Sequence, residues 1–210
     1  LSSMVYMAYN QRSLFVTGVW TTVQLALAGT AIAFVLALLM VFLRIQEPDK
    51  RNNDFVKLIK IVANRFARFY IFVIRGTPMM VQAMVIYWGF AFANDGSTLP
   101  LIPSGILIVS INTGAYMAEI VRGGIISIDK GQFEGAMSIG MTHSQTMFKV
   151  IIPQVMRNIL PSVSNEFVIN IKDTSVLNVI GVTELYYFAG IIKRQSFETF
   201  QTYLVVCALY

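Results

Sequence analysis

Charged side chains are scarce in this chain of 210 residues: they make up 13% of it, whereas apolar residues make up 56%. An ordinary soluble domain carries about 25% charged residues. The apolar residues are also gathered into long runs, a pattern typical of membrane-spanning helices. Together these features exclude a water-soluble globule and a disordered chain, and they predict an all-α integral membrane protein.

Groups that carry chemistry are equally few. Cys207 is the only cysteine and His143 the only histidine, which excludes an intrachain disulfide and leaves no metal-binding cluster. No plausible Ser/His/Asp set can be built with one histidine, and no Gly-Lys dipeptide occurs, so the chain has no Walker A phosphate loop. The sequence therefore predicts no catalytic residue, no metal and no cofactor bound by this chain, and it disfavours an enzyme.

The basic residues are unevenly distributed. The net charge of +5 arises from 16 Lys and Arg against 11 Asp and Glu. Half of the basic residues lie between two apolar blocks, namely Arg44, Lys50, Arg51, Lys57, Lys60, Arg65, Arg68 and Arg75. The positive-inside rule places such a loop in the cytoplasm. This argues against a nucleic-acid partner, makes the lipid bilayer the surroundings of the apolar runs, and orients the chain with its amino terminus outside and its carboxyl terminus in the cytoplasm.

Five membrane spans are predicted, at residues 14–43, 69–93, 103–121, 146–171 and 197–210. The last is too short to cross a bilayer, so the chain is expected to stop before its natural end. Two stretches have alternatives. Residues 55–72 form an amphipathic helix on the membrane surface or the lower end of the second span, and residues 176–192 form a re-entrant pair of short segments or a sixth span.

A cytoplasmic loop between the third and fourth spans carries an apolar helix face outside the membrane. Phe133, Met137 and Met141 recur at i, i+4 and i+8, which predicts a short helix over residues 131–144. Its motif follows the order E-x-A-x3-G-x9-V-x-I-P, with Glu134, Ala136, Gly140 and Pro153 at the defining positions. Such a face either lies on the bilayer or docks into a groove of a partner protein.

This loop resembles the EAA loop of ABC importer permeases, the coupling helix that docks on the ATP-hydrolysing subunit. Four further stretches resemble the polar amino-acid uptake subfamily of these permeases: Arg75-Gly76-Thr77-Pro78, residues 115–124, Ser164-Asn165-Glu166-Phe167 and Lys172-Asp173-Thr174-Ser175. The resemblance implies ATP-driven import of a polar amino acid by alternating access, through a core of about five transmembrane helices in the cell membrane of a prokaryote. The ATPase-coupling residues that it implies are Phe133, Glu134, Gly135, Ala136, Met137, Gly140 and Met141.

The same resemblance implies several partners. These are ABC ATPase subunits that bind ATP and Mg, a second permease that is identical or related, and an extracytoplasmic amino-acid-binding protein or fused domain. Three alternatives stay open: an ABC permease for another small solute, a secondary carrier, and a membrane scaffold without transport. A carrier is disfavoured because the two halves of the chain show no internal repeat.

An amino-acid substrate brings a carboxylate and an ammonium group, so a site in the membrane needs partners for both. The candidates in the predicted spans are Thr77, Met79, Gln82, Asn112, Glu119, Asn165 and Glu166. For four of these residues a structural role is an alternative explanation. Thr77 is a possible N-cap of a helix that begins at Pro78, Glu119 is a possible ion-pair partner of Arg122 at i+3, and Asn165 and Glu166 are possible hydrogen-bond partners of a neighbouring helix.

Overall fold

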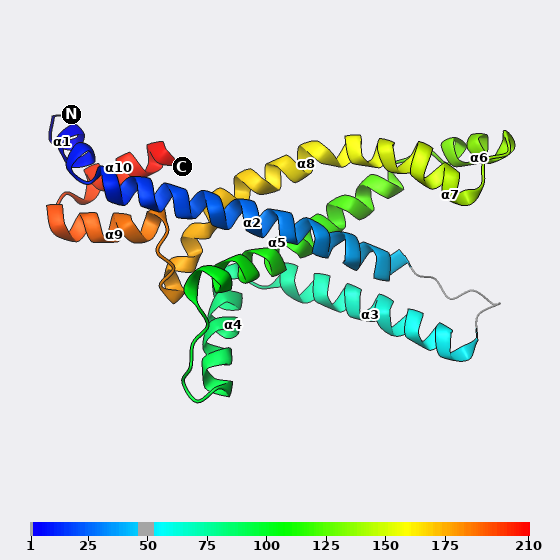
Figure 1. Ribbon diagram of the computed structural model, residues 1–210, viewed down its shortest axis with the longest axis horizontal. Helices are drawn as coiled ribbons and strands as arrows, with labels where there is room; N and C mark the ends of the chain where they lie inside the picture. Colours follow the sequence, from blue (N-terminus) through cyan, green and yellow to red (C-terminus); the bar gives the residue numbers. More distant parts are fainter. Residues whose placement is uncertain (1, 46–52) are drawn as a thin grey trace.

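The computed structural model describes residues 2–45 and 53–210, and in this part of the chain every regular element is a helix (Figure 1). The elements are α1 (Ser2–Asn10), α2 (Arg12–Ile45), α3 (Asp54–Gly76), α4 (Met79–Ala93), α5 (Leu101–Ile126), α6 (Lys130–Ser138), α7 (His143–Thr146), a π-helix (Met147–Ile151), α8 (Ile152–Asp173), a 3₁₀-helix (Thr174–Ile180), α9 (Leu185–Ser196) and α10 (Thr199–Leu209). The stretch of the predicted basic loop that contains Lys50 and Arg51 lies outside the described residues.

The longest helix, α2, packs along α5, and this is the most extensive helix pair in the fold. With 34 residues, α2 is about 51 Å long at 1.5 Å per residue. Small residues on its buried face, among them Ala26, Gly29, Ala33 and Ala37, let the two backbones approach closely. A Cβ atom at Gly29 would lie 2.5 Å from Cγ1 of Val109 on α5, so the close approach requires glycine at this position.

The chain bends sharply between α3 and α4, whose axes meet at 111°. The bend falls on Thr77 and Pro78, which have extended backbone angles. Proline disfavours helical geometry at the residue before it and has no N–H to continue the helix. As a result α4 projects sideways from the long axis of the molecule (Figure 1).

A second bend of 61° separates the long helical segment that ends at Ile180 from α9. Gly181 adopts a left-handed conformation with φ of 89°, which favours glycine. Glu184 then caps α9 by accepting hydrogen bonds from the backbone N–H groups of Tyr186 and Tyr187 at 2.8 and 2.7 Å. The predicted segment 176–192 is therefore divided into a 3₁₀-helix and the first part of α9.

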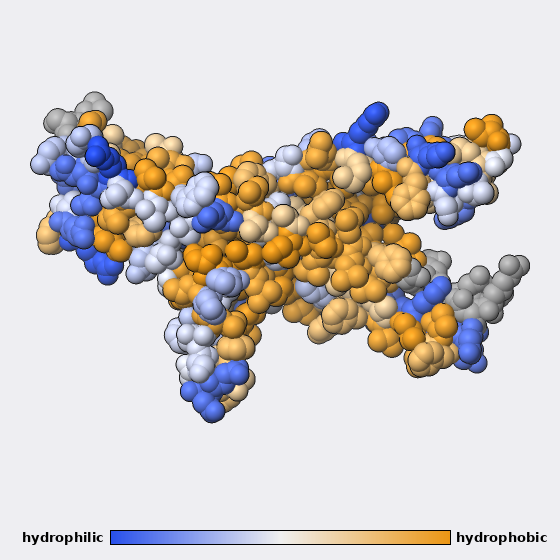
Figure 2. Space-filling view, viewed as in Figure 1, coloured by the Kyte–Doolittle hydropathy of each residue, from blue (hydrophilic) through white to orange (hydrophobic). Residues whose placement is uncertain are grey.

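Among the described residues, two helices, α2 and α5, are each long and apolar enough to cross a membrane, and up to four spans result if each bent pair counts as one. The predicted spans 14–43 and 103–121 lie inside these two helices, whereas 69–93 is divided between α3 and α4. Residues 55–72 lie within α3, a single helix that runs from Asp54 to Gly76. A broad hydrophobic belt covers the middle of the molecule, and polar residues gather at both ends and at the tip beyond α4 (Figure 2).

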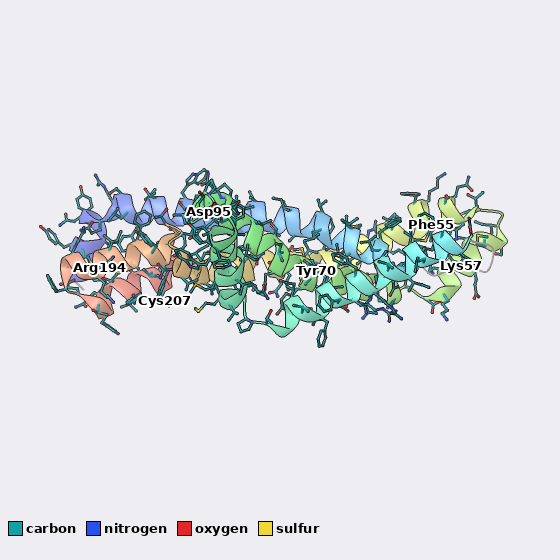
Figure 3. All side chains as sticks on the ribbon, turned by 90° about the horizontal axis from the view of Figure 1, so that it is seen from below. Phe55, Lys57, Tyr70, Asp95, Arg194 and Cys207 are labelled. Carbon is teal, nitrogen blue, oxygen red and sulfur yellow. The ribbon has the colours of Figure 1, made fainter. Side chains whose placement is uncertain are left out.

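The two ends of the molecule differ in their elements. Helices α9 and α10 lie at one end with Arg194 and Cys207, and the start of α3 lies at the other end with Phe55 and Lys57 (Figure 3). Helix α10, which has 11 residues, packs against α1 and α9 at the α9 end of the molecule (Figure 1). The orientation with the amino terminus outside and the carboxyl terminus in the cytoplasm stays a prediction.

Candidate functional site: a polar cavity at the helix break

Two adjacent buried residues of α5, Asn112 and Thr113, anchor the polar groups inside the bundle. Asn112 Nδ2 donates a hydrogen bond of 2.9 Å to Gln82 Oε1 on α4. Gln82 Nε2 in turn donates to Thr77 Oγ1 at 2.8 Å and to the carbonyl oxygen of Ile74 at 2.8 Å. This chain of bonds binds the last turn of α3 to the first turn of α4, and it satisfies groups that would be unpaired at the break.

Thr113 belongs to a second network that joins three helices. Its hydroxyl donates to Asn170 Oδ1 on α8 at 2.7 Å, and Asn170 Nδ2 donates to Thr30 Oγ1 on α2 at 2.8 Å. Both Thr113 and Asn170 are 2% exposed. Because buried polar groups are costly unless they are hydrogen-bonded, these bonds fix the register of α2, α5 and α8 beside the cavity.

A cavity of about 330 Å³ opens between the start of α4, the middle of α5 and the last turns of α8. Its lining residues are Thr77, Pro78, Met79, Asn112, Thr113, Tyr116, Glu166, Ile169, Asn170 and Asp173. The volume lies within the range of small-molecule sites. No lysine or arginine is among these described lining residues.

One wall of the cavity carries two carboxylates. Glu166 and Asp173 are seven residues apart on α8, a spacing that places both on one helix face. Both are partly buried, and neither forms a hydrogen bond or an ion pair within the described part of the chain. A partly buried carboxylate in a membrane-spanning helix marks a functional site by default, and this pair gives the wall a negative charge that suits a cationic group.

The opposite wall is the amino-terminal end of α4. The N-cap position is Pro78, and no side chain caps the helix there. The structural explanation offered for Thr77 is therefore wrong, because the Thr77 hydroxyl donates to the carbonyl oxygen of Val73 at 2.9 Å and closes α3 instead. An uncapped helix start carries free N–H groups and the positive end of the helix dipole, which suit an anion.

Four of the seven predicted substrate residues line this cavity: Thr77, Met79, Asn112 and Glu166. Gln82 lies behind it and holds Thr77 and Asn112 in place. Asn165 is exposed and lies outside the cavity lining.

Glu119 lies in a different pocket, in an ion-paired cluster. It accepts hydrogen bonds from Arg122 at 2.8 Å and from Arg44 on α2. The pairing of Glu119 with Arg122 that the i+3 spacing suggested is confirmed. Arg44, which lies 75 positions away in the chain, is a second partner that sequence spacing gave no means of finding.

The prediction missed the other six lining residues: Pro78, Thr113, Tyr116, Ile169, Asn170 and Asp173. Two of them carried a signal, because Glu166, Asn170 and Asp173 stand at i, i+4 and i+7 and so share one helix face. Tyr116 stands at i+4 from Asn112 on α5 in the same way. Extending each helix face from its first polar residue would have found Tyr116, Asn170 and Asp173.

The predicted coupling helix is shorter than residues 131–144. The structure has α6 from Lys130 to Ser138, started by Asp129, whose side chain accepts from Gly131 N at 2.6 Å. Gly140 ends the segment with a tight turn in the left-handed conformation, at φ of 87°. Met141 lies beyond the helix and does not continue the face of Phe133 and Met137, because the left-handed turn redirects the chain.

The coupling residues that do lie on α6 differ in exposure. Ala136 is buried, and Phe133 is partly buried against the core, with its ring 5.3 Å from that of His143. Glu134 and Gly135 are exposed, and Met137 is 43% exposed. Ile139, just after the helix, is 79% exposed. Met137 on α6 and Ile139 just after it thus expose apolar side chains at an end of the molecule that lies outside the hydrophobic belt and is largely polar (Figure 2).

A bundle of apolar helices with a polar cavity at a broken helix, and a short exposed helix at one end, defines a membrane translocation subunit. The chain belongs to the family described as binding-protein-dependent transport system inner membrane component, whose model matches residues 55–210. It is therefore a multi-pass permease of this family.

Three known proteins illustrate the relationship. The L-cystine transport system permease protein TcyB of Bacillus subtilis is 37% identical over 181 residues, which cover 86% of this chain and 71% of TcyB. The glutamine transport system permease protein GlnP of Escherichia coli is 38% identical over 149 residues, which cover 71% of this chain and 68% of GlnP. The crystal structure of an amino acid ABC transporter with histidines superposes with a TM-score of 0.82 at 36% identity, covering 96% of this chain and 88% of that one.

Proposed function

We propose that this chain is the permease subunit of an ATP-driven importer for a polar amino acid. The observation that carries the proposal is the two-sided cavity. The uncapped start of α4 offers N–H groups to a carboxylate, and Glu166 and Asp173 on the facing helix offer acceptors to an ammonium group. A zwitterionic amino acid matches both walls at once.

The charge balance of the cavity favours a substrate with an additional positive charge. Two carboxylates face the cavity, and no ion pair of the described residues neutralises them. The α-ammonium group satisfies one of them, which leaves the other for a cationic side chain. The names of the relatives support amino-acid import in general, since they include L-cystine, glutamine and an amino acid ABC transporter crystallised with histidines.

The same proposal includes the assembly. ATPase subunits that bind ATP and Mg dock on the apolar surface of α6, with Glu134, Gly135 and Met137 exposed toward them. The α6 end then faces the cytoplasm, and the α9 end faces outside, where a solute-binding protein or domain delivers the amino acid. A second permease, identical or related, completes the pathway. The chain itself binds no cofactor.

The test is a binding and uptake screen with the assembled complex in proteoliposomes. All common amino acids are offered, and uptake is measured with and without ATP. Glu166→Gln and Asp173→Asn are each expected to weaken binding of the selected amino acid at least about tenfold, because each removes a charge-assisted hydrogen bond. The matched control is Asp54→Asn, which removes a carboxylate that is 96% exposed and far from the cavity.

The outcomes separate the alternatives. ATP-dependent uptake of one class of polar amino acid, lost in the two cavity variants and kept in the control, supports the proposal. Uptake of no amino acid by a complex that imports another small solute overturns the substrate assignment. Uptake that follows an ion gradient and ignores ATP would make the protein a secondary carrier.

A further inference from the structure

A second pocket of about 540 Å³ lies beside the substrate cavity, between α2, α3 and α5. Three arginines line it, Arg44, Arg68 and Arg75, together with Tyr116 and Glu119. Glu119 is fully engaged, because its two oxygens accept from Arg44 and Arg122. The pocket is therefore positively charged, the opposite of the cavity beside it.

Two of these arginines have no carboxylate partner in the described part of the chain. Arg68 is exposed and forms no ion pair with a described residue. Arg75 is also exposed, and its guanidinium lies over the ring of Tyr116, 5.4 Å from the ring centre. Unpaired guanidinium groups lining a pocket are the usual partners of carboxylates and phosphates. The chemistry of this pocket thus fits an anionic group.

Tyr116 belongs to the lining of both pockets. On α5 it stands at i+4 from Asn112 and is followed at i+3 by Glu119, so one helix face leads from the cavity to the arginine pocket. On the facing chain the boundary falls between Gly76, which lines the arginine pocket, and Thr77, which lines the cavity. The tyrosine ring and the helix break thus separate the two spaces.

The side chain of Tyr116 is held by weak contacts only. Its hydroxyl forms no hydrogen bond within the described residues, and the side chain is 36% exposed. Its contact with Arg75 is a cation–π interaction, which is a weak contact compared with a buried ion pair. A rotation of this one side chain would join the two pockets.

Resting on the proposed function, we propose that Tyr116, held by Arg75, is the inner gate of the substrate cavity, and that the arginine pocket binds the carboxylate of the departing amino acid. In the cavity the carboxylate lies at the start of α4, next to Thr77. Beyond the ring of Tyr116, the arginines of the adjoining pocket without a carboxylate partner are Arg75 and Arg68. The substrate then passes from a helix dipole to two guanidinium groups in the direction of α6.

The arginine pocket also has an apolar side chain suited to lipid contact, since Phe72 in its wall is 78% exposed. A phosphate of an anionic lipid would satisfy the same arginines. The shared wall with the substrate cavity favours the amino-acid carboxylate. The lipid is therefore an outcome of the test below.

The experiment uses the assembled complex in vesicles loaded with the labelled amino acid that the uptake screen selects. An ATP analogue that is not hydrolysed holds the complex open to the outside, and loss of label reports whether the inner gate is closed. The variants are Tyr116→Ala, Tyr116→Phe, Arg75→Gln and, as the matched control, Arg65→Gln, which removes an exposed arginine of α3 that lines neither pocket.

In the trapped state, Tyr116→Ala and Arg75→Gln are expected to lose label about tenfold faster than the wild type, whereas Tyr116→Phe and Arg65→Gln stay tight. Without nucleotide all five proteins are expected to be tight, because the outer gate is then closed. Leakage of Tyr116→Ala in both states overturns the assignment, because it indicates a general loss of packing. Retention by Tyr116→Ala and Arg75→Gln in the trapped state overturns it as well.

Two further arms complete the design. If Tyr116→Ala does not assemble, the gate is tested by comparing the leak of Arg75→Gln with that of Arg75→Lys. Only the neutral variant, Arg75→Gln, is expected to leak. Uptake by Arg68→Gln and Arg75→Gln is also measured in vesicles of phosphatidylglycerol and of phosphatidylcholine. A loss of uptake only in phosphatidylglycerol would assign the pocket to a lipid phosphate and overturn the exit role. A wild-type complex that binds no amino acid refutes the proposed function itself, and the gate with it.

Discussion

Gln82 on α4 and Asn112 on α5 are joined by a hydrogen bond of 2.9 Å, and both side chains are buried. Gln82 uses its amide nitrogen at the same time to hold Thr77 and Ile74 across the helix break. One amide therefore fixes the geometry of two walls of the cavity. A sharp bend inside the membrane needs such a partner because no water is present to satisfy the freed backbone groups.

Gln82→Leu is expected to destabilise the permease by about 1–3 kcal/mol, because Asn112 Nδ2 and the carbonyl of Ile74 lose their buried partner. The measurement is thermal unfolding of the purified complex. Gln24→Leu is the matched control: Gln24 is exposed on α2, and its replacement should change stability by less than about 0.5 kcal/mol. Equal shifts for the two variants would contradict the role assigned to Gln82.

Gly18→Ala is expected to destabilise the contact between α2 and α9. A Cβ atom at Gly18 would lie 2.8 Å from Cα of Leu185 and 3.2 Å from its backbone nitrogen. Backbone atoms cannot rotate away, so the helices must separate, at a cost of about 1–3 kcal/mol. The control is Gly89→Ala on α4, where a Cβ atom meets nothing within 4 Å and the better helix propensity should stabilise slightly. Thermal unfolding of both variants checks that the melting temperature falls for Gly18→Ala and rises slightly for Gly89→Ala.

Tyr210→Phe is expected to loosen the α9 end of the molecule. The Tyr210 hydroxyl donates to Glu184 at 2.8 Å, and Glu184 is fully buried. Losing a hydrogen bond to a buried carboxylate costs about 1.5–3 kcal/mol. Hydrogen exchange of the first turn of α9 should rise, because this carboxylate also caps that turn. Unchanged exchange there would indicate that the two backbone bonds hold Glu184 on their own.

Sequence reasoning succeeded for features of the fold that depend on a single local stretch of the chain. The uninterrupted apolar run produces α2, and the helix start suggested at Pro78 lies one residue from the start of α4 at Met79. The two carbonyl oxygens and the hydroxyl that accept from Gln82 Nε2 lie within eight positions of it, whereas its bond to Asn112 spans 30 positions. No periodicity within one helix predicts such a pair.

The remaining errors have the same origin. Periodicity at i, i+4 and i+8 joined Met141 to Phe133, but the left-handed turn at Gly140 separates them. The pairing of Glu119 with Arg44 depends on how α2 crosses α5, which composition does not encode. The two cavity walls likewise meet only because α4 and α8 both pack against α5, so the sequence could nominate Thr77 and Glu166 without indicating that they line one cavity.

Met137→Glu is expected to impair coupling to the ATPase without destabilising the permease. Met137 is 43% exposed on α6, so a carboxylate there is tolerated in the free permease, with a stability change below about 0.5 kcal/mol. In the assembled importer the same carboxylate would be buried without a partner against the ATPase, which is strongly unfavourable. Co-purification of the ATPase and ATP-driven uptake should both fall, while thermal unfolding of the permease stays unchanged.

The control for this prediction is Arg194→Glu, which reverses a charge on an exposed residue at the opposite end of the molecule (Figure 3). It should leave co-purification of the ATPase intact, because the ATPase docks at the α6 end in the proposed assembly. A Met137→Glu permease that retains its ATPase and its coupled uptake would place the docking surface elsewhere on the α6–α7 segment. Since Glu134 and Gly135 are exposed on the same helix, Glu134→Arg then tests whether charge, and not apolar contact, joins the two subunits.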